Sequence, residues 1–401
     1  MFGALFVTGE IRTELGGRLL RGVVPQIAAA RGVRFIGATG FGSGWTRLAR
    51  LDLRARALTL AAYASRLKRR GPALAEPTPV AAFVHRAFWK AKGADGSAES
   101  YIGPVLAALE RHRGAPLAYI GLGPTENFSA RRWWNPARGS EPAASLAAIE
   151  GFAPLRALAG SRRLWRERYR LLRALAASPG VRQHAHIRGC DCWPVIREEL
   201  TGVVLLQWPW SARAMDEAAA ALDALRPRVA LTYAEAGGWG RALVLEARRR
   251  NVRTVGLQHG FIYRHWLNYL HERDEMEPDP ANPAGDRGFP APTVTLLFDA
   301  YAANHLSTAG QFPPHALTVV GSARLDALAA AARQLSDGDL DRARRGVTGS
   351  ARGVFVLLVT KYRQVRGVLS SLIDATRALD VKLAIKTHPA LHSVVQEWER
   401  Q

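Results

Sequence analysis

Strands and helices alternate along residues 228–258, and this alternation limits the possible folds of the chain more than any other feature. RVALTY (228–233) has the composition of a strand, GRALVLEARRRN (240–251) that of a helix and VRTVGLQ (252–258) that of a second strand. Helices of about ten residues between apolar strands are typical of βαβ units, whose strands lie parallel in one sheet. The sequence therefore predicts an α/β fold.

The alternation stops at EPDPANPAGDRGFPAP (277–292) and resumes after it. This interruption predicts two Rossmann-like lobes with parallel sheets: an N-terminal lobe at 1–290, whose first 110 residues fit no recognisable pattern, and a C-terminal lobe at 291–401. Further strands are predicted at 116–128, 201–210, 294–299, 316–321, 354–360 and 381–387, and helices at 143–177, 215–225 and 371–380.

Composition narrows the class of protein. With 401 residues and 48% hydrophobic content, the chain is long enough for two domains. No run of 18 apolar residues is present, and the N-terminus lacks the basic start of a signal peptide, so a cytoplasmic location is expected. Cys190 and Cys192 are the only cysteines, which excludes a disulfide framework. A C-x-C pair supplies half a metal site, but no second Cys/His cluster has matching spacing.

The net charge of +21 and the pI of about 11.0 permit two interpretations. One is a polyanionic partner such as an anionic membrane surface, a nucleic acid or a phosphorylated substrate. The other is a compositional bias, because arginine supplies nearly all of the positive charge and is spread along the predicted helices. No recognised nucleic-acid-binding motif is present, so no nucleic-acid partner is expected.

Parallel sheets place ligand sites at the carboxyl ends of their strands, so the strand ends are the first places to look for chemistry. In LTYAEAGGWGRAL (231–243), Glu235 follows a strand directly, and Gly237, Gly238 and Gly240 open the next helix. Glu235 is a candidate general base or hydroxyl ligand. It is equally a candidate for a charge interaction with the helix N-terminus.

The second strand end is VRTVGLQHGFIYRHW (252–266), where an apolar strand stops at Gln258 and His259. Histidine is well suited to proton transfer near neutral pH, and Gly260 lets the backbone pass close to a ligand. Arg264 and His265 follow in an aromatic loop. These residues predict a catalytic His259 with acceptor-side contacts around it, although a lone histidine also occurs as a structural residue.

Two strand ends in the C-terminal half carry groups suited to phosphate. Thr360 and Lys361 follow the strand at 354–360, where they could equally form a solvated turn. Lys386 and His388 end the strand at 381–387, and Pro389 stops it. A lysine and a histidine together can neutralise a diphosphate, so this end predicts a phosphate site.

At LQHGF (257–261), VGSARLD (320–326) and KTHP (386–389) the chain resembles the two-lobed GT-B glycosyltransferase superfamily. The relatives suggested by these motifs are capsule polysaccharide transferases, CDP-glycerol glycerophosphotransferases and the sialyltransferases with a His-Pro motif. Sugar-nucleotide 2-epimerases share the lobes and a similar Gly-Ser-x-Arg-x-Asp segment. The resemblance spans about residues 200–390, and its motifs are short.

The resemblance implies roles for particular residues. His388 would contact the nucleotide phosphates, Gly321 and Ser322 would contact the nucleotide, and His259 would lie on the acceptor side near the reacting centre. Members of these families continue well beyond the His-Pro motif, whereas this chain ends twelve residues after Pro389. An abbreviated second lobe is therefore expected.

The sequence predicts a metal-independent transferase that uses a nucleotide-activated sugar or polyol phosphate to build cell-envelope polysaccharide. His259 or Glu235 would accept the proton of the attacking hydroxyl, and the basic residues of the second lobe would stabilise the leaving phosphates. The donor is a substrate, so no cofactor is expected. The expected partners are this donor, a sugar or lipid-linked acceptor and the anionic inner membrane surface. The alternatives are a sugar-nucleotide 2-epimerase and an inactive or truncated GT-B protein.

Overall fold

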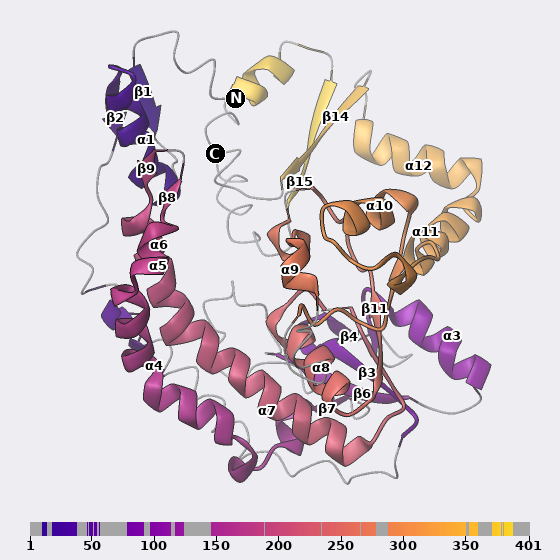
Figure 1. Cartoon of the computed structure of the whole chain (residues 1–401). Coiled ribbons are helices and arrows are strands. Elements are labelled where there is room, and N and C mark those ends of the chain that lie inside the picture. Colours follow the sequence, from indigo (N-terminus) through magenta and orange to yellow (C-terminus); the bar gives the residue numbers. More distant parts are fainter. Residues whose placement is uncertain are drawn as a thin grey trace. The chain divides into compact units, whose positions relative to one another are not determined.

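The computed structural model of the chain is drawn in Figure 1. It describes residues 10–13, 18–37, 46, 48–50, 52, 53, 56, 78–91, 97–113, 117–123, 146–187, 189–233, 235–264, 266–277, 288–349, 353–359, 371–377, 379 and 381–387. The chain divides into two compact units, and the boundary between them falls after Gly321.

Within the described residues of the first unit, seven strands form one sheet in the order β13-β12-β11-β10-β3-β6-β7, and every neighbouring pair is parallel. The predicted α/β class with a parallel sheet is confirmed. The strands are β3 (Val80–His85), β6 (Ala118–Leu122), β7 (Leu146–Ala148), β10 (Val229–Thr232), β11 (Arg253–Leu257), β12 (Val294–Leu297) and β13 (Leu317–Val319).

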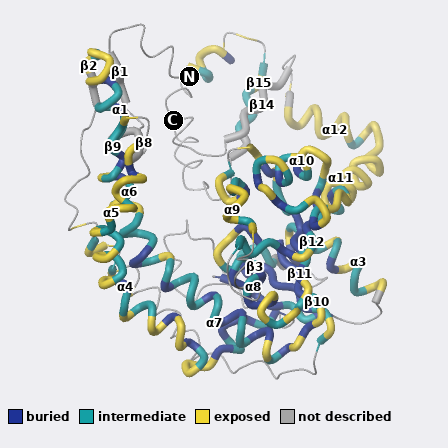
Figure 2. The backbone as a smooth tube through the Cα atoms, viewed as in Figure 1, coloured by how far each residue is buried: buried dark blue, intermediate teal, exposed yellow. Residues whose placement is uncertain are grey.

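The central strand β3 is buried on both faces because helices cover both sides of the sheet. Phe83 packs with residues of α7 (Trp208–Leu225) and α8 (Gly238–Arg249) on one face. Val84 packs on the other face with Ile102 and with Leu106 of α3 (Gly103–Arg113). Successive side chains of a strand point to opposite faces, so an uninterrupted apolar run such as VAAFV suits this position. Figure 2 shows this region in the colour of buried residues.

The expected lobe boundary at residue 290 falls inside this sheet. β12 pairs with β11, from Val255 opposite Val294, and β13 pairs with β12, from Thr295 opposite Leu317. Both strands therefore belong to the first unit, and the division comes at Gly321. The Pro- and Gly-rich interruption at 277–292 lies within one unit, because the chain resumes the same sheet after it.

The strand predicted at 201–210 is wrong, because this segment is helical. It links α6 (Trp193–Gly202) to α7 through a π-helical turn at Val203–Gln207. A short run such as VVLL does not distinguish a buried strand from a buried helix by its periodicity. Here Val204 and Leu205 are fully buried, and the π-helical turn stands just before Pro209, which lacks the N–H that an uninterrupted α-helix would use. The helix predicted at 143–177 begins only at Ala159, after β7.

In the second unit, β14 (Gly353–Val359) and β15 (Val381–Thr387) form a parallel pair, as expected for βα units. Two helices precede them, α11 (Ala323–Arg333) and α12 (Asp337–Thr348), and residues 371–377 are also helical. Further helices and strands among the described residues are β1 (Glu10–Thr13), α1 (Arg18–Ala30), β2 (Arg34–Gly37), β4 (Trp89–Ala91), β5 (Ser97–Glu99), α4 (Ala159–Ala177), α5 (Pro179–Gln183), β8 (His186–Ile187), β9 (Cys190–Asp191), α9 (Arg273–Met276) and α10 (Ala300–Thr308).

Candidate functional site

The strand order places a topological switch point between β3 and β10. From β3 the chain builds outward through β6 to β7, then returns to add β10, β11, β12 and β13 on the other side of β3. Open α/β sheets bind ligands at the carboxyl edge beside such a reversal. Three aromatic or imidazole side chains stand there: His85 ends β3, Tyr233 follows β10 and His259 lies two residues beyond β11.

His259 is held between two tyrosines at this edge. The centroid of its ring lies 5.4 Å from that of Tyr101 and 5.2 Å from that of Tyr233. Burial lowers the pKa of His259, and a hydrogen bond from the ring to the main-chain carbonyl of Tyr233 opposes this shift in part. Near neutral pH the ring is therefore neutral, and the nitrogen that does not donate can accept a proton.

His85 is a second neutral imidazole in the same cluster. Burial, together with repulsion from His259, lowers its pKa to about 4, against a hydrogen bond to the carbonyl of Leu122. Its ring meets Tyr233 at 5.8 Å and Trp239 at 6.5 Å between centroids. The two histidines thus lie close enough to interact electrostatically, and each uses one ring nitrogen to bind a main-chain carbonyl of a neighbouring strand end.

Tyr233 packs against both imidazoles, and the carboxyl of Glu99 lies beside Tyr233. Glu99 is 3% exposed and accepts hydrogen bonds from the main-chain N–H groups of Tyr101 (2.7 Å) and Ile102, which caps the start of α3. The Tyr233 hydroxyl accepts a hydrogen bond from the N–H of His85 at 3.0 Å. Burial raises the pKa of Tyr233, and the neighbouring Glu99 raises it further. Because Glu99 occupies the N-terminus of α3, this helix end is closed to a phosphate.

Glu235 lies apart from the imidazoles, in the core beneath the loop that follows β11. Its carboxyl is 3% exposed, and its Oε1 atom accepts a 2.6 Å hydrogen bond from the hydroxyl of Tyr269. Its Oε2 atom is buried without a hydrogen-bond partner among the described residues. Burial raises the pKa of Glu235 to about 7. The side chain therefore ties the loop to the end of β10 through Tyr269, and its expected role as a proton acceptor stays a prediction.

This burial predicts how the stability of the protein depends on pH. Between the ordinary pKa of 4.5 and about 7, Glu235 binds more protons in the folded than in the unfolded chain, so the free energy of unfolding falls as the pH rises through this window. The variant Glu235→Gln is expected to lose this dependence. At pH 8 it should be more stable relative to the wild type than at pH 4.5, by about 3 kcal/mol. Urea denaturation at both pH values measures the difference, and a difference that does not change with pH would contradict it.

Gln258 braces the loop that carries His259. Its Nε2 atom donates to the carbonyl of Gly260 at 2.9 Å, and its Oε1 atom accepts from the N–H of Phe298 at 2.7 Å. Gln258 is 6% exposed, so both ends of its amide serve the protein rather than an acceptor. Gly260 is half-buried, with open space where a Cβ would lie, and Arg264 is exposed on the same loop.

Of the residues expected to bind the nucleotide, Gly321 ends the first unit and Ser322 begins the second. Gly321 has φ = +83° at the end of the first unit, a conformation that favours glycine. Ser322 begins the second unit, and its hydroxyl accepts from the N–H of Leu325 at the start of α11. Lys386 lies in β15, but its side chain is outside the described residues, as are His265, Thr360, Lys361 and His388.

The C-x-C segment at residues 190–192 is held in place by hydrogen bonds from α1. Gln26 of α1 binds the main chain of Asp191 twice: Nε2 donates to the carbonyl at 2.8 Å, and Oε1 accepts from the N–H at 2.9 Å. Cys192 is buried, and Cys190 is half-exposed. Across the part of the chain that the structure describes, no three His, Cys, Asp or Glu side chains are grouped to hold a metal ion. In the same part, no helix is both long and apolar enough to span a bilayer.

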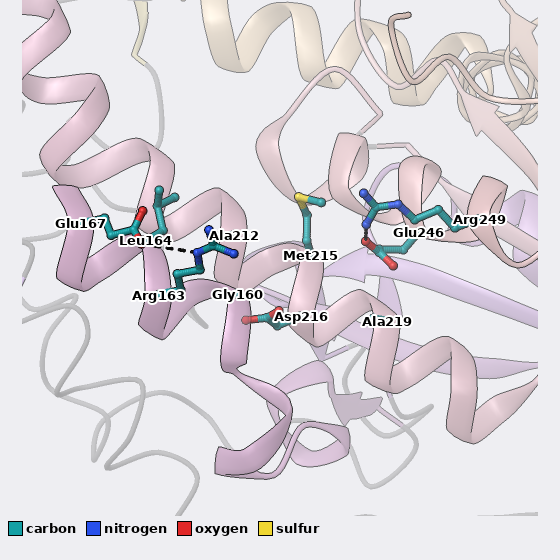
Figure 3. A pocket seen from close by; sticks show the side chains of 10 residues that line it. All are labelled: Gly160, Arg163, Leu164, Glu167, Ala212, Met215, Asp216, Ala219, Glu246 and Arg249. Atoms are coloured by element: carbon teal, nitrogen blue, oxygen red, sulfur yellow. Dashed lines mark hydrogen bonds and ion pairs between the residues drawn. The ribbon is translucent and has the colours of Figure 1, made fainter. Parts of the chain in front are cut away.

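Figure 3 shows an open pocket of about 470 Å³ between α4, α7 and α8. Its charged groups are paired with one another or with the main chain. Arg163 lies 3.4 Å from Glu167, Asp216 accepts from the N–H of Ser161 at 2.8 Å, and Glu246 binds Arg249. Because these charges are already satisfied, the pocket is a weaker candidate for a ligand site than the carboxyl edge of the sheet.

Sequence reasoning missed His85, Glu99 and Tyr101. A signal for His85 was present, because VAAFVH (80–85) is an apolar strand that ends on histidine, as GLQH does at His259. Glu99 and Tyr101 carry no such signal. They reach the cluster only because α3 packs under the edge of the sheet.

Comparison with solved structures includes the following weak similarities. UDP-N-acetylglucosamine 2-epimerase from Rickettsia bellii matches with a TM-score of 0.29 and 15% identity, over 47% of this chain and 46% of that protein. UDP-GlcNAc 2-epimerase from Methanocaldococcus jannaschii matches with a TM-score of 0.36 and 11% identity, over 80% of this chain and 68% of that protein. No family model and no curated protein matches. This chain thus spans less than half the length of the Rickettsia protein, and its fold class rests on its own sheet.

Proposed function

We propose that this protein is an enzyme acting on a nucleotide-activated sugar, in which His259 and His85 exchange protons with the substrate. The observation that carries the proposal is the pair of neutral imidazoles beside the switch point of an open parallel sheet. Histidines held neutral by burial are suited to accept a proton at physiological pH. The carboxyl edge at a switch point is the usual ligand position in such sheets.

In the transferase reaction, an acceptor hydroxyl attacks the anomeric carbon of the donor sugar. The bond from that carbon to the nucleotide phosphate breaks, and His259 takes the hydroxyl proton. The charge that develops on the leaving phosphate needs cationic or hydrogen-bonding groups. The strand ends offer Lys361 and Lys386 for this role, and the family resemblance adds His388 and the hydroxyl of Ser322. The products are a glycoside in cell-envelope polysaccharide and the free nucleotide. With a polyol-phosphate donor, the hydroxyl would instead attack the phosphorus that carries the polyol, giving a phosphodiester and a nucleoside monophosphate.

The second candidate reaction is epimerisation of a sugar nucleotide. Inversion at a ring carbon must remove a hydrogen on one face and return one on the other, which suits a site with two proton-exchanging groups. The pairing of His85 with His259 favours this candidate. Epimerisation is also the reaction named for both solved proteins above, although those similarities are too weak to choose between the reactions.

Solvent exchange distinguishes the two reactions. The protein is incubated in D₂O with each of UDP-GlcNAc, UDP-glucose, GDP-mannose, CMP-sialic acid and CDP-glycerol, and proton NMR follows the sugar ring and the free nucleotide. An epimerase would place deuterium on the inverted carbon without any acceptor. A transferase would release nucleotide only when an acceptor saccharide is added, with no deuterium on the ring.

The double variant His85→Asn/His259→Asn serves as the control, because asparagine cannot exchange protons near neutral pH. Either activity should disappear in it. If the double variant turned over a nucleotide sugar at the wild-type rate, the imidazole pair would not be the reacting site. If no nucleotide sugar reacted with the wild type under either condition, the proposal would fail.

A further inference from the structure

The segment after His259 carries a row of exposed aromatic rings that the proposed proton transfer does not use. Phe261 is 66% exposed and Tyr263 is 49% exposed, while Ile262 between them is buried in the core with Tyr269 and Leu297. Alternate side chains of an extended segment point to opposite sides. Phe261 and Tyr263 therefore face away from the core together.

These rings lie parallel to their neighbours. Phe261 stacks on Tyr301 at 5.7 Å between centroids, with 9° between the ring planes, and Tyr301 stacks on His305 at 6.2 Å and 7°. Tyr263 stacks on Trp266 at 5.7 Å and 12°. We call these five residues the aromatic platform. The rings around His85 and His259 instead meet at steep angles, from 56° to 89°.

The platform is built on a rigid base. The amide of Gln258 ties Gly260 to Phe298, which brings the loop beside the start of α10. Asp299 caps α10 by accepting from the N–H of Ala302 at 2.8 Å, and this helix carries Tyr301. The same amide lies next to His259 in the sequence, so the loop it ties carries both His259 and Phe261.

The local charge argues against an anionic occupant. Between residues 258 and 277 four carboxylates outnumber two arginines, although the whole chain carries +21. One of the two, Arg273, is paired with Glu277 at 2.8 Å. An anionic lipid surface or a phosphate would gain little attraction here. The fitting ligand is uncharged, with flat apolar faces and a rim of hydroxyl groups.

We propose that the aromatic platform binds a neutral saccharide, with a pyranose ring lying on the exposed side of Phe261, which Tyr301 supports from its other side. One face of a pyranose ring presents C–H groups, which pack against the electron-rich face of an aromatic ring. The ligand would be the acceptor sugar of the proposed transferase reaction, so this inference deepens the proposed function and rests on it. It places the acceptor chain beside His259, where one of its hydroxyls could lose a proton.

Saturation-transfer NMR tests the proposal with three neutral probes: cellotetraose, maltotetraose and chitotetraose. At least one is expected to bind the wild type. Phe261→Ala and Tyr301→Ala should each weaken its binding about tenfold, the size expected for the loss of one stacked ring. The control Leu155→Ala removes another exposed apolar side chain of the same unit, 53% exposed, and should bind as the wild type does.

Three results would overturn the inference. The first is that the wild type binds none of the three tetrasaccharides. The second is that it binds one of them and neither platform variant changes this binding. The third is that it binds phosphatidylglycerol vesicles but no tetrasaccharide, and that Phe261→Ala loses the vesicle binding. Phe261 and Tyr301 lie on different elements and are both exposed, so circular dichroism should show both variants folded. The proposed function can fail separately from this inference. If His259→Asn kept full turnover while only the platform variants lost saccharide binding, the imidazole chemistry would be refuted and the saccharide site would stand.

Discussion

The variant His259→Asn is expected to slow the proposed reaction by roughly 10²- to 10⁴-fold, the usual contribution of a positioned general base. Asparagine can still donate a hydrogen bond to the carbonyl of Tyr233, but it cannot accept and release a proton near neutral pH. The fall should appear in kcat, because the base acts after the substrate is bound. Steady-state rates with the nucleotide sugar found by the exchange assay measure the effect.

Two further measurements separate a chemical role of His259 from a structural one. Burial lowers the pKa of His259 below its ordinary 6.5, so the wild-type rate should fall to half its maximum only at a pH below 6.5, as the imidazole gains a proton. In His259→Asn the pKa of His85 should rise, because one cause of its depression is the charge on His259. NMR titration of His85 measures that shift. The control is His315→Asn, an exposed histidine outside the site, and equal rate losses in both variants would contradict the assignment.

The variant Arg86→Met is expected to lower the free energy of unfolding by about 3–5 kcal/mol, as is usual when one partner of a buried ion pair is removed. Arg86 follows His85 directly, and its Nη2 atom lies 2.5 Å from Oε1 of Glu150, with side chains 7% and 8% exposed. Its Nε atom also donates to the carbonyl of Gly123. Arg213 also approaches Glu150, with Nη2 3.7 Å from Oε1. Urea denaturation measures the loss.

Two comparisons test the physical cause of that loss. The double variant Arg86→Met/Glu150→Met removes both partners, so it leaves no carboxylate of this pair buried without Arg86. Arg213 still has Glu217, with Nε 2.7 Å from Oε1. The double variant should therefore be more stable than Arg86→Met alone. The exposed pair Arg273–Glu277 is the surface control, and Arg273→Met should cost less than about 1 kcal/mol. If Arg86→Met cost no more than Arg273→Met, the buried pair would not hold this edge of the sheet together.

Glu235 and Gln258 show that residues in the same strand-end pattern can have very different partners in the fold. Both are polar residues at the carboxyl ends of parallel strands, as His259 is, and the sequence therefore gives all three the same standing. In the structure, the carboxyl of Glu235 is committed to Tyr269, and the amide of Gln258 to Gly260 and Phe298. Tyr269 lies 34 residues from Glu235 along the chain, and Phe298 lies 40 residues from Gln258, while Gly260 is only 2 residues away. Two of the three partners are therefore distant in sequence.

The sequence by itself determined the α/β class and most of the strands, because burial on both faces requires continuous apolar runs and parallel neighbours require intervening helices. It also located His259, since an imidazole directly after such a run is visible without coordinates. It did not recognise the helical nature of 201–210, where a short apolar run satisfies either structure.

Only the tertiary structure decided which strands are neighbours. β3 lies between β6 and β10, although about 150 residues separate β3 from β10, and alternation along the chain does not encode this order. That order creates the switch point and brings His85 to His259, and the packing of α3 adds Glu99 and Tyr101. Side-chain pKa values depend on the same packing, because burial and neighbouring charges are properties of the assembled sheet rather than of any local stretch of sequence.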